Sequence, residues 1–366
     1  MKKIFNIEKC LYIIFFLTFI LGLYIFIISP IKTSIASILI LIISLLIIIS
    51  LAILLFIFNN MKNNNNFLQK KRNKKIYTTF LFLLFIISFF QLMIFFICAA
   101  RYNYHYKNLW KDKYLYKYDK LLFGWLFKDG QLALTLDQSK KFNPNTTIHK
   151  IIASLLQICY FCYYLIPYVS IYIINLGKFI YFHYKLNDYK MKKIKIKKIK
   201  YEFIYLLNIY ILTYSQVIFI NTLVPSISPR LYLIDKYKNP LKFLGLAEFI
   251  NKTFQDNNSA NSFPSGHVAE TFCVALGFFG LKKKKVGIFL LIMSLLIMIS
   301  TLFLRYHYFV DVVMGNIVSF ISFFIVNYIE KKDNFINKNN EIDDIENANL
   351  FINKILDENE LTNISV

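Results

Sequence analysis

The sequence predicts an all-α, polytopic integral membrane protein with about eight transmembrane helices. The first observation is composition: 57% of the 366 residues are hydrophobic and only 17% are charged, whereas roughly 25% are charged in an ordinary soluble domain. The second is that the apolar residues gather in runs long enough to cross a bilayer. The third is that lysine and arginine cluster between those runs. These patterns exclude a soluble globular protein, a disordered chain and a coiled coil.

Each predicted span is a run of about 20 mainly apolar residues, the length that crosses the hydrocarbon core of a membrane. The weakest span by hydropathy is the sixth, because it opens with Pro-Ser-Gly-His and also contains Glu270. The fourth is longer than one crossing requires, so we expect it to tilt, kink or extend into water. In order, the spans cover residues 11–29, 34–58, 76–100, 151–182, 203–224, 264–281, 286–304 and 311–329.

Basic segments test this number of helices. They precede the first span and follow the second, fourth, sixth and eighth spans, at residues 2–9, 62–75, 185–200, 282–285 and 331–332. Every even-numbered crossing therefore ends in a basic segment, and the positive-inside rule places both termini in the cytoplasm. The same reasoning explains the net charge of +22 as a topology signal rather than a nucleic-acid-binding surface. The loops expected on the extracytoplasmic or lumenal face are 30–33, 101–150, 225–263 and 305–310.

The two ends of the chain and the longest outer loop are interpreted separately. Residues 1–26 have the basic start and apolar stretch of a signal peptide, but the stretch is too long and lacks a cleavage site, so we expect a retained helix. The outer loop 101–150 is rich in tyrosine and lysine, which predicts one or two short interfacial helices. The tail 331–366 is Asn-rich and acidic and should be loosely ordered in the cytoplasm.

Three polar groups stand at the outward ends of predicted spans, where ionisable side chains are costly and indicate function. They are residues 263–267, Phe-Pro-Ser-Gly-His; residues 305–311, Arg-Tyr-His-Tyr-Phe-Val-Asp; and residues 229–230, Pro-Arg. The predicted topology places all three on the same face of the membrane. We therefore expect them to form one site.

The spacing of His307 and Asp311 has a direct chemical reading. The two are four residues apart, which puts them on one face of a helix. A carboxylate in that position can accept one ring N–H of the histidine, fix its tautomer and leave the other nitrogen free. This is the arrangement of a nucleophile and the group that orients it.

The second polar group suits an anion. A proline in the first turn favours a helix start, so Ser265 and Gly266 would present a hydroxyl and backbone N–H groups at the positive end of that helix. His267, on the same turn, could donate a proton to a leaving oxygen. Arg230 and Arg305 would supply fork-shaped donors to phosphate oxygens. Together these residues predict a phosphoryl-transfer site.

At these residues the chain resembles the type 2 phosphatidic acid phosphatase superfamily. Residues 263–267 look like its central signature, and His307 with Asp311 looks like the end of its third motif. The resemblance covers roughly residues 76–330, which implies a six-helix phosphatase or phosphotransferase core that includes the outer loop 101–150. The segment 1–75 would then be an added two-helix hairpin followed by a basic cytoplasmic loop.

The resemblance also implies a role for each site residue. His307 would attack phosphorus and form a phosphohistidine, Asp311 would orient it, and His267 would protonate the departing alcohol. The phosphate oxygens would be held by Ser265, Gly266, Arg230 and Arg305. Two histidines and a carboxylate could instead bind a divalent metal, but the Ser-Gly cradle would then have no task, so no metal or cofactor is expected.

The chain departs from the family pattern at two positions. The lysine expected in the first motif is replaced by Leu223, and the arginine expected six residues before the histidine is replaced by Thr301. Arg305 lies one helical turn beyond Thr301, so we expect it to reach the same phosphate from the same face. The sequence around residues 304–311, with Leu-Phe-Gly at 122–124, resembles the branch that contains inositol phosphorylceramide synthases.

The predicted function is that of a membrane lipid phosphatase or phosphotransferase, independent of metal, whose partners are the bilayer and a lipid phosphate. Two alternatives stay open. The first is a transferase similar to inositol phosphorylceramide synthase, which moves a phospho-headgroup to a lipid alcohol. The second is a non-enzymatic lipid transporter with a degenerate site. Phosphatidic acid, isoprenyl pyrophosphate, phosphatidylglycerol phosphate, and phosphatidylinositol with ceramide all present a phosphate at this depth.

Overall fold

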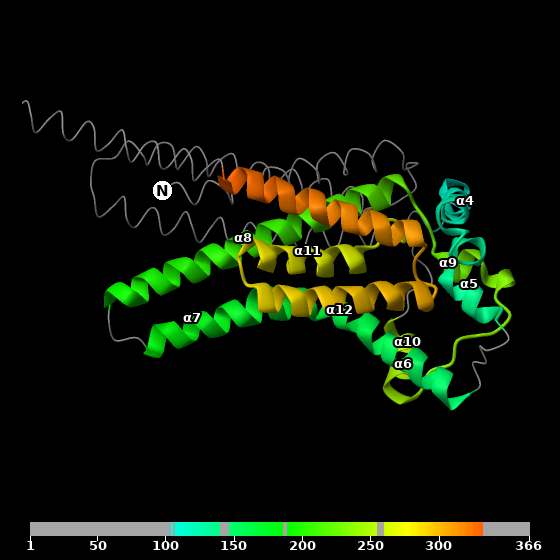
Figure 1. The fold of residues 1–366 in the computed structure, drawn as a ribbon, viewed down its shortest axis with the longest axis horizontal. Helices are drawn as coiled ribbons and strands as arrows, with labels where there is room; N and C mark the ends of the chain where they lie inside the picture. Colours follow the sequence, from blue (N-terminus) through cyan, green and yellow to red (C-terminus); the bar gives the residue numbers. More distant parts are fainter. Residues whose placement is uncertain (1–103, 105–106, 140–145, 186–188, 255–259, 332–366) are drawn as a thin grey trace, which may run out of the picture. The chain divides into compact units, whose positions relative to one another are not determined.

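The computed structural model describes residues 104, 107–139, 146–185, 189–254 and 260–331. Every regular element in these ranges is helical, which confirms the all-α class there (Figure 1). The predicted spans 11–29, 34–58 and 76–100 and the tail after residue 331 lie outside the described residues. The chain divides into two compact units, Met1–Phe323 and Phe324–Val366. All the side chains that form the site below belong to the first unit.

Among the described residues, three helices are long and apolar enough to cross a membrane. They are the stretch Ile194–Leu223 of helix α8, the helix α12 (Lys284–Phe303), and the helix Phe309–Lys331. The helix α11 (Gly266–Gly280) is also apolar but shorter. These helices support a membrane protein and correspond to the last four predicted spans. The total of eight spans, and the face on which each loop lies, stay predictions.

The predicted span 151–182 is not one continuous α-helix. It is divided into α6 (Thr147–Phe161), a 3-10 turn (Cys162–Tyr164), a π-helical segment (Tyr168–Ile173) and α7 (Ile174–Lys185). Pro167 immediately precedes the π-helical segment, and proline has no N–H with which to continue the α-helical ladder. The expected interruption of this long run is therefore present.

Helix α8 (Tyr189–Leu223) begins well before the predicted boundary at residue 203. Most of the lysine-rich segment 185–200, which we expected to be a loop, is helical. Lysine is a good helix former. A basic segment can therefore extend an apolar helix beyond the membrane rather than end it.

The described part of the outer loop 101–150 contains two short α-helices; that they lie at the membrane interface stays a prediction. These are α4 (Asp112–Phe123) and α5 (Leu132–Asp137), separated by a 3-10 turn at Lys128–Gly130. Figure 1 shows them at one end of the helices α8, α11 and α12, next to α9 (Pro229–Tyr232). The longer helix α10 (Gly245–Phe254) packs against α6. The short helices α4, α5 and α9 thus lie at the end of the bundle where the polar motifs are.

A close contact joins α11 to the helix Phe309–Lys331. A Cβ atom on Gly315 would lie 2.7 Å from the carbonyl oxygen of Ser265. One turn later, Ser319 donates a hydrogen bond of 2.8 Å to the carbonyl of Ala269. Small residues at these positions let the two backbones approach closely, as is common between membrane helices. The contact fixes the start of α11 against the helix that carries Asp311.

Gly315→Ala should therefore disturb the protein more than an alanine at a roomy helical glycine. The new methyl group must displace the Ser265 backbone, an overpacking that costs roughly 1–3 kcal/mol. Gly177→Ala is the matched control, because a Cβ atom on Gly177 of α7 meets nothing within 4 Å. Thermal unfolding in detergent should show a lower Tm for Gly315→Ala and an unchanged or higher Tm for Gly177→Ala. Equal Tm values would contradict the close contact.

Candidate active site

The turn that ends α12 positions His307. The carbonyl of Thr301 accepts hydrogen bonds from Tyr306 N–H at 2.9 Å and from His307 N–H at 3.3 Å, while Arg305 N–H reaches the Leu302 carbonyl at 3.4 Å. This pattern is a Schellman motif, in which the residue after the C-cap takes a left-handed conformation. Arg305 occupies that position with φ +69°. The turn reverses the chain and places His307 just before the helix Phe309–Lys331.

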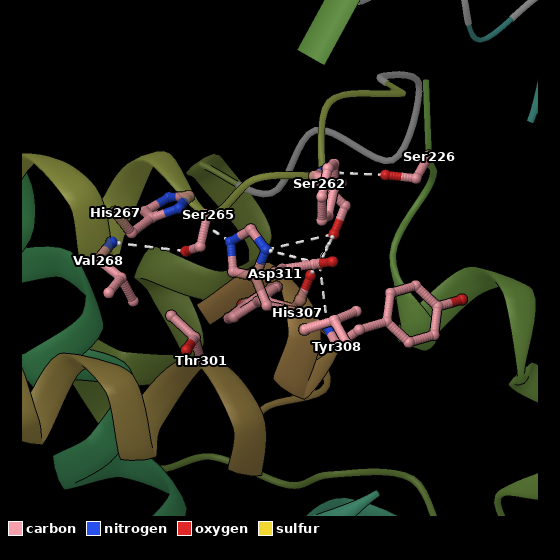
Figure 2. A network of polar contacts seen from close by, with 12 residues as sticks. Ser226, Ser262, Ser265, His267, Val268, Thr301, His307, Tyr308 and Asp311 are labelled. Atoms are coloured by element: carbon pink, nitrogen blue, oxygen red, sulfur yellow. Dashed lines mark hydrogen bonds and ion pairs between the residues drawn. The ribbon is translucent and has the colours of Figure 1, made fainter. Parts of the chain in front are cut away.

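His307 and Asp311 are paired as predicted, but they do not share a helix face, because His307 lies in the loop before the helix that begins at Phe309. The Nδ1 atom of His307 lies 3.2 Å from Oδ2 of Asp311, and both side chains are buried. Two further groups donate to the same carboxylate oxygen: the Ser262 hydroxyl at 2.7 Å and the Tyr308 N–H at 3.0 Å (Figure 2). An oxygen that receives these donors favours a proton on Nδ1 of His307, which leaves Nε2 with its lone pair.

Ser262 is a site residue that the sequence reasoning missed. Its hydroxyl also lies 3.2 Å from Nδ1 of His307 and 3.2 Å from the carbonyl oxygen of Tyr306. Its backbone is held by Ser226, whose carbonyl accepts from the Ser262 N–H at 3.0 Å and whose hydroxyl accepts from Phe263 N–H at 2.9 Å. The only signal in the sequence was a serine that directly precedes the Phe-Pro-Ser-Gly-His segment.

Burial keeps His307 neutral. The side chain lies in the loop before the last described helix, and desolvation lowers its pKa from 6.5 to about 4. The neutral imidazole therefore predominates at pH 7, and a neutral ring with its proton on Nδ1 has a nucleophilic Nε2.

His267 meets His307 from the first turn of α11. Ser265 caps this helix: its hydroxyl accepts from Val268 N–H at 3.5 Å, and its own N–H donates to the Asp311 carbonyl at 3.0 Å. The Nδ1 atom of His267 then lies 3.1 Å from Nε2 of His307. Figure 2 shows the two rings side by side, with Asp311 beyond His307. The structure thus brings together both histidines, Asp311 and Ser265.

The amide groups at the start of α11 face no intrahelical acceptor, because the first N–H groups of any helix lack one. Gly266 and His267 occupy these positions. A Cβ atom on Gly266 would make only ordinary contacts, the nearest at 3.5 Å from Val217. Crowding therefore does not require a glycine at this position.

Arg230 lies on the side of His267. Its guanidinium reaches Oδ1 of Asn251 at 3.3 Å and the hydroxyl of Tyr306 at 3.4 Å, and it lies 5.7 Å from the Tyr306 ring centroid. Tyr306 in turn stacks on Tyr160, with ring centroids 4.4 Å apart. Arg230 is thus joined to the histidine pair through two aromatic rings.

Arg305 does not follow the expectation. Its guanidinium is buried, donates to Oδ1 of Asp137 at 3.2 Å and to the Asn239 carbonyl at 3.0 Å, and lies 3.8 Å from the ring centroid of Tyr237. The prediction that Arg305 shares a helix face with Thr301 was wrong: α12 ends at Phe303, so Arg305 lies beyond the helix. The left-handed backbone of Arg305 directs its side chain toward Asp137 and Asn239.

Buried aspartates of the outer loop hold the loop that carries His307. Asp119 accepts from Phe309 N–H and from Val310 N–H, both at 2.8 Å, and so caps the helix Phe309–Lys331. Asp112 accepts from the Tyr308 hydroxyl at 2.9 Å and from Ile227 N–H at 3.0 Å. The sequence reasoning missed both. Their spacing of seven residues, on one face of a lysine-rich helix, was the available signal.

The comparisons with known proteins agree with the central part of this site. The family model of the PAP2 superfamily matches residues 204–335, a range that includes His267, His307 and Asp311. Residues 204–335 carry a PAP2 superfamily domain. Tyr160 and the aspartates of the outer loop lie outside the matched range.

A curated relative extends the likeness. The "PA-phosphatase related-family protein" of Dictyostelium discoideum is 33% identical over 212 residues, which are 56% of this chain and 37% of the relative. The chain therefore spans little more than a third of that relative's length. No solved structure matches the chain. The branch containing inositol phosphorylceramide synthases stays a prediction.

Asp119 should make stability depend on pH. Burial raises its pKa from 3.8 to about 7, so the folded protein keeps a proton that the unfolded chain releases between about pH 4 and pH 7. Stability contributed by this group is present below pH 4 and is lost as pH rises toward 7. Asp119→Asn cannot lose that proton. Its Tm deficit relative to wild type should therefore be smaller at pH 8 than at pH 5, and a deficit that grows with pH would contradict the assignment.

The neutral state of His307 can be observed directly. Histidine labelled with 13C and 15N, in protein held in detergent micelles, should show one ring that titrates near pH 4. The resonance is assigned by its loss in His307→Ala. A midpoint between pH 6 and pH 7 would mean that the ring is solvated and that burial does not set its charge.

Proposed function

We propose that the protein is a membrane lipid phosphatase or phosphotransferase that cleaves a lipid phosphate ester through a phosphohistidine. The observation that carries the proposal is the hydrogen-bonded row Asp311–His307–His267 inside the PAP2 superfamily domain. His267 and Asp311 stand at the starts of two apolar helices, α11 and Phe309–Lys331, which suits a substrate that lies in a membrane. The relative from Dictyostelium supports a phosphatase-type activity through its printed name.

The first step is attack by His307. Its Nε2 lone pair forms a bond to phosphorus, and the bond from phosphorus to the lipid oxygen breaks with its electron pair on that oxygen. Asp311 stabilises the positive charge that the ring acquires, because its carboxylate faces Nδ1. In the resting site, Nδ1 of His267 lies 3.1 Å from Nε2 of His307. Since phosphorus and the leaving oxygen must lie between them, substrate binding has to part the rings.

His267 acts as the general acid in the first step and as the general base in the second. A phosphate dianion beside its ring favours the imidazolium form, which takes its second proton from solvent as substrate binds. The ring then gives the Nδ1 proton to the leaving oxygen and becomes neutral. In the second step its Nδ1 accepts a proton from an attacking hydroxyl, the phosphorus–nitrogen bond breaks, and His307 is restored.

The phosphate oxygens need donors that remain fixed during transfer. The N–H groups of Gly266 and His267 at the positive end of α11 suit this task, with the Ser265 hydroxyl beside them. Arg230 supplies a cation from the Tyr306 side. Arg305, whose guanidinium is bound to Asp137 and Asn239, instead stabilises the turn that presents His307.

Transfer to an alcohol is the second candidate function, and the surroundings of His267 favour it. Tyr160 and Tyr163 cover its ring at centroid distances of 4.5 and 4.0 Å. Beside them, the Tyr306 hydroxyl donates to Gln157 at 3.1 Å and to Asn251 at 3.4 Å. Aromatic walls restrict water, and amide groups can hold a hydroxylated partner. A non-enzymatic transporter would leave the row of hydrogen bonds from Asp311 to His267 without a task.

Replacement of His307 by alanine should abolish turnover, because His307 supplies the nitrogen that attacks phosphorus in the proposed mechanism. Wild type and His307→Ala, purified in detergent, would be incubated with lipid monophosphates, lipid pyrophosphates and phosphodiester donors. Released phosphate and new phospholipids would be measured by colorimetry and mass spectrometry. Free phosphate that depends on His307 identifies a phosphatase, whereas a new phospholipid identifies a transferase.

His149→Ala is the matched control, since His149 at the start of α6 contacts Thr146 and is not part of the site. It should keep wild-type activity. Vanadate, which mimics five-coordinate phosphorus, should inhibit both wild type and this control. Full activity in His307→Ala, or resistance to millimolar vanadate, would exclude the phosphohistidine mechanism.

A further inference from the structure

The hydroxyl of Tyr160 lies beside the row Asp311–His307–His267 and has no part in the mechanism proposed above. The hydroxyl of Tyr160 lies 2.6 Å from Nε2 of His267, and its ring lies 4.5 Å from the imidazole centroid. Tyr160 stands near the end of α6, 107 positions before His267 and outside the residues 204–335 that match the PAP2 superfamily. We infer that Tyr160 is a positioning residue for His267, which keeps Nδ1 as the nitrogen that faces the reacting phosphate. The inference rests on the proposed function.

The proton positions in the resting row require a donor at Tyr160. Nδ1 of His307 gives its proton toward Asp311, so Nε2 of His307 is an acceptor. Nδ1 of His267, 3.1 Å away, must then carry a proton. A neutral imidazole has one N–H, which leaves Nε2 of His267 as an acceptor that needs a donor. The Tyr160 hydroxyl supplies it.

The same hydroxyl serves the charged state of His267. When substrate binding makes the ring an imidazolium, both nitrogens become donors, and the Tyr160 oxygen can accept from Nε2–H. The hydroxyl thus stays bonded to Nε2 while Nδ1 gives its proton to the leaving oxygen and later recovers it from the attacking hydroxyl. Tyr160 keeps its own proton overall and does not touch the phosphate.

Packing holds the Tyr160 hydroxyl in place. One face of its ring stacks on Tyr306 at 4.4 Å and an interplanar angle of 22°. The Tyr306 hydroxyl is anchored to Gln157, which is buried and lies one turn before Tyr160 on α6. Tyr163 presents its edge to the His267 ring at 4.0 Å. His267 is thereby confined between two tyrosines of one helical segment, and of these Tyr160 is bonded to its nitrogen.

Without the hydroxyl, His267 can place its proton on either nitrogen. In the tautomer with the proton on Nε2, the lone pair on Nδ1 of His267 would face the lone pair on Nε2 of His307. Nδ1 would then have no proton to give to a leaving group. Loss of the acceptor would also disfavour the imidazolium. The effect should depend on the leaving group, since a good leaving group needs no acid.

Tyr160→Phe keeps the aromatic ring and removes only this hydroxyl. For a lipid alkyl phosphate, kcat should fall on the order of 10- to 100-fold, within the range that general acid catalysis supplies, while KM stays near that of wild type. For a nitrophenyl phosphate, the rapid burst of nitrophenol that reports the first step should keep its rate. The alkaline limb of the kcat/KM profile should move to lower pH, because the acid form of His267 is weakened.

Tyr116→Phe is the control, as it also removes only a tyrosine hydroxyl, one that donates to Asp129 at 2.7 Å and has no role in the proposed site. It should leave the alkyl and nitrophenyl rates and the pH profile near wild type. Equal losses on both substrates in Tyr160→Phe, or the same losses in Tyr116→Phe, would overturn the positioning role. In His267→Ala, adding Tyr160→Phe should cause no further loss, whereas additive losses would also overturn it.

A measurement without substrate completes the test. The 15N shifts of His267 should show the Nδ1–H tautomer in resting wild-type protein and a larger share of the Nε2–H tautomer in Tyr160→Phe. The same tautomer in both would overturn the inference even if the variant were unstable. His307→Ala separates the two proposals: turnover that depends on His307 but not on Tyr160 refutes only the role of Tyr160, whereas turnover independent of His307 refutes the proposed function as well.

Discussion

The site depends on one buried carboxylate. Oδ2 of Asp311 faces the Ser262 hydroxyl, the Tyr308 amide and Nδ1 of His307, and these partners come from two segments of the chain, one before α11 and one after α12. Hydrogen bonds to a charged group contribute about 1.5–3 kcal/mol each, and a buried carboxylate that loses its donors is strongly unfavourable. The same contacts that stabilise the charge therefore determine where the segment before α11 and the end of α12 must lie.

The outer segments extend this constraint. Asp119 caps the helix that begins at Phe309, Asp112 joins Tyr308 to Ile227, and Asp137 accepts from Arg305 at the left-handed turn. Each aspartate accepts hydrogen bonds from the loop that follows α12 or from the segment around 227. The outer loop is thus a support for the loop with His307 as well as a cover for the bundle. Its sequence lies outside the matched PAP2 range, so this support belongs to the part of the chain that the family comparison does not describe.

Acid–base chemistry and substrate choice have separate structural origins in the proposed mechanism. The row from Asp311 to His267 serves any phosphate ester, because bond formation and proton transfer occur at the same three side chains. The groups that differ from one lipid to another would contact the aromatic and amide side chains around Tyr306, which are contributed by α6 and α10. In that mechanism, water and a lipid alcohol would compete for the same phosphohistidine beside Tyr160 and Tyr163.

The sequence by itself determined the local features of this protein. Apolar runs predicted the helices that α8, α11, α12 and Phe309–Lys331 form, because a crossing needs a long apolar run. The four-residue spacing also predicted the contact between His307 and Asp311, although His307 lies in the loop before the helix rather than on its face. Only the tertiary structure decided the rest. The left-handed turn after α12 directed Arg305 to Asp137, and α6 brought Tyr160 to His267 across 107 positions. Such contacts follow from how distant segments pack, and no periodicity within a single segment encodes them.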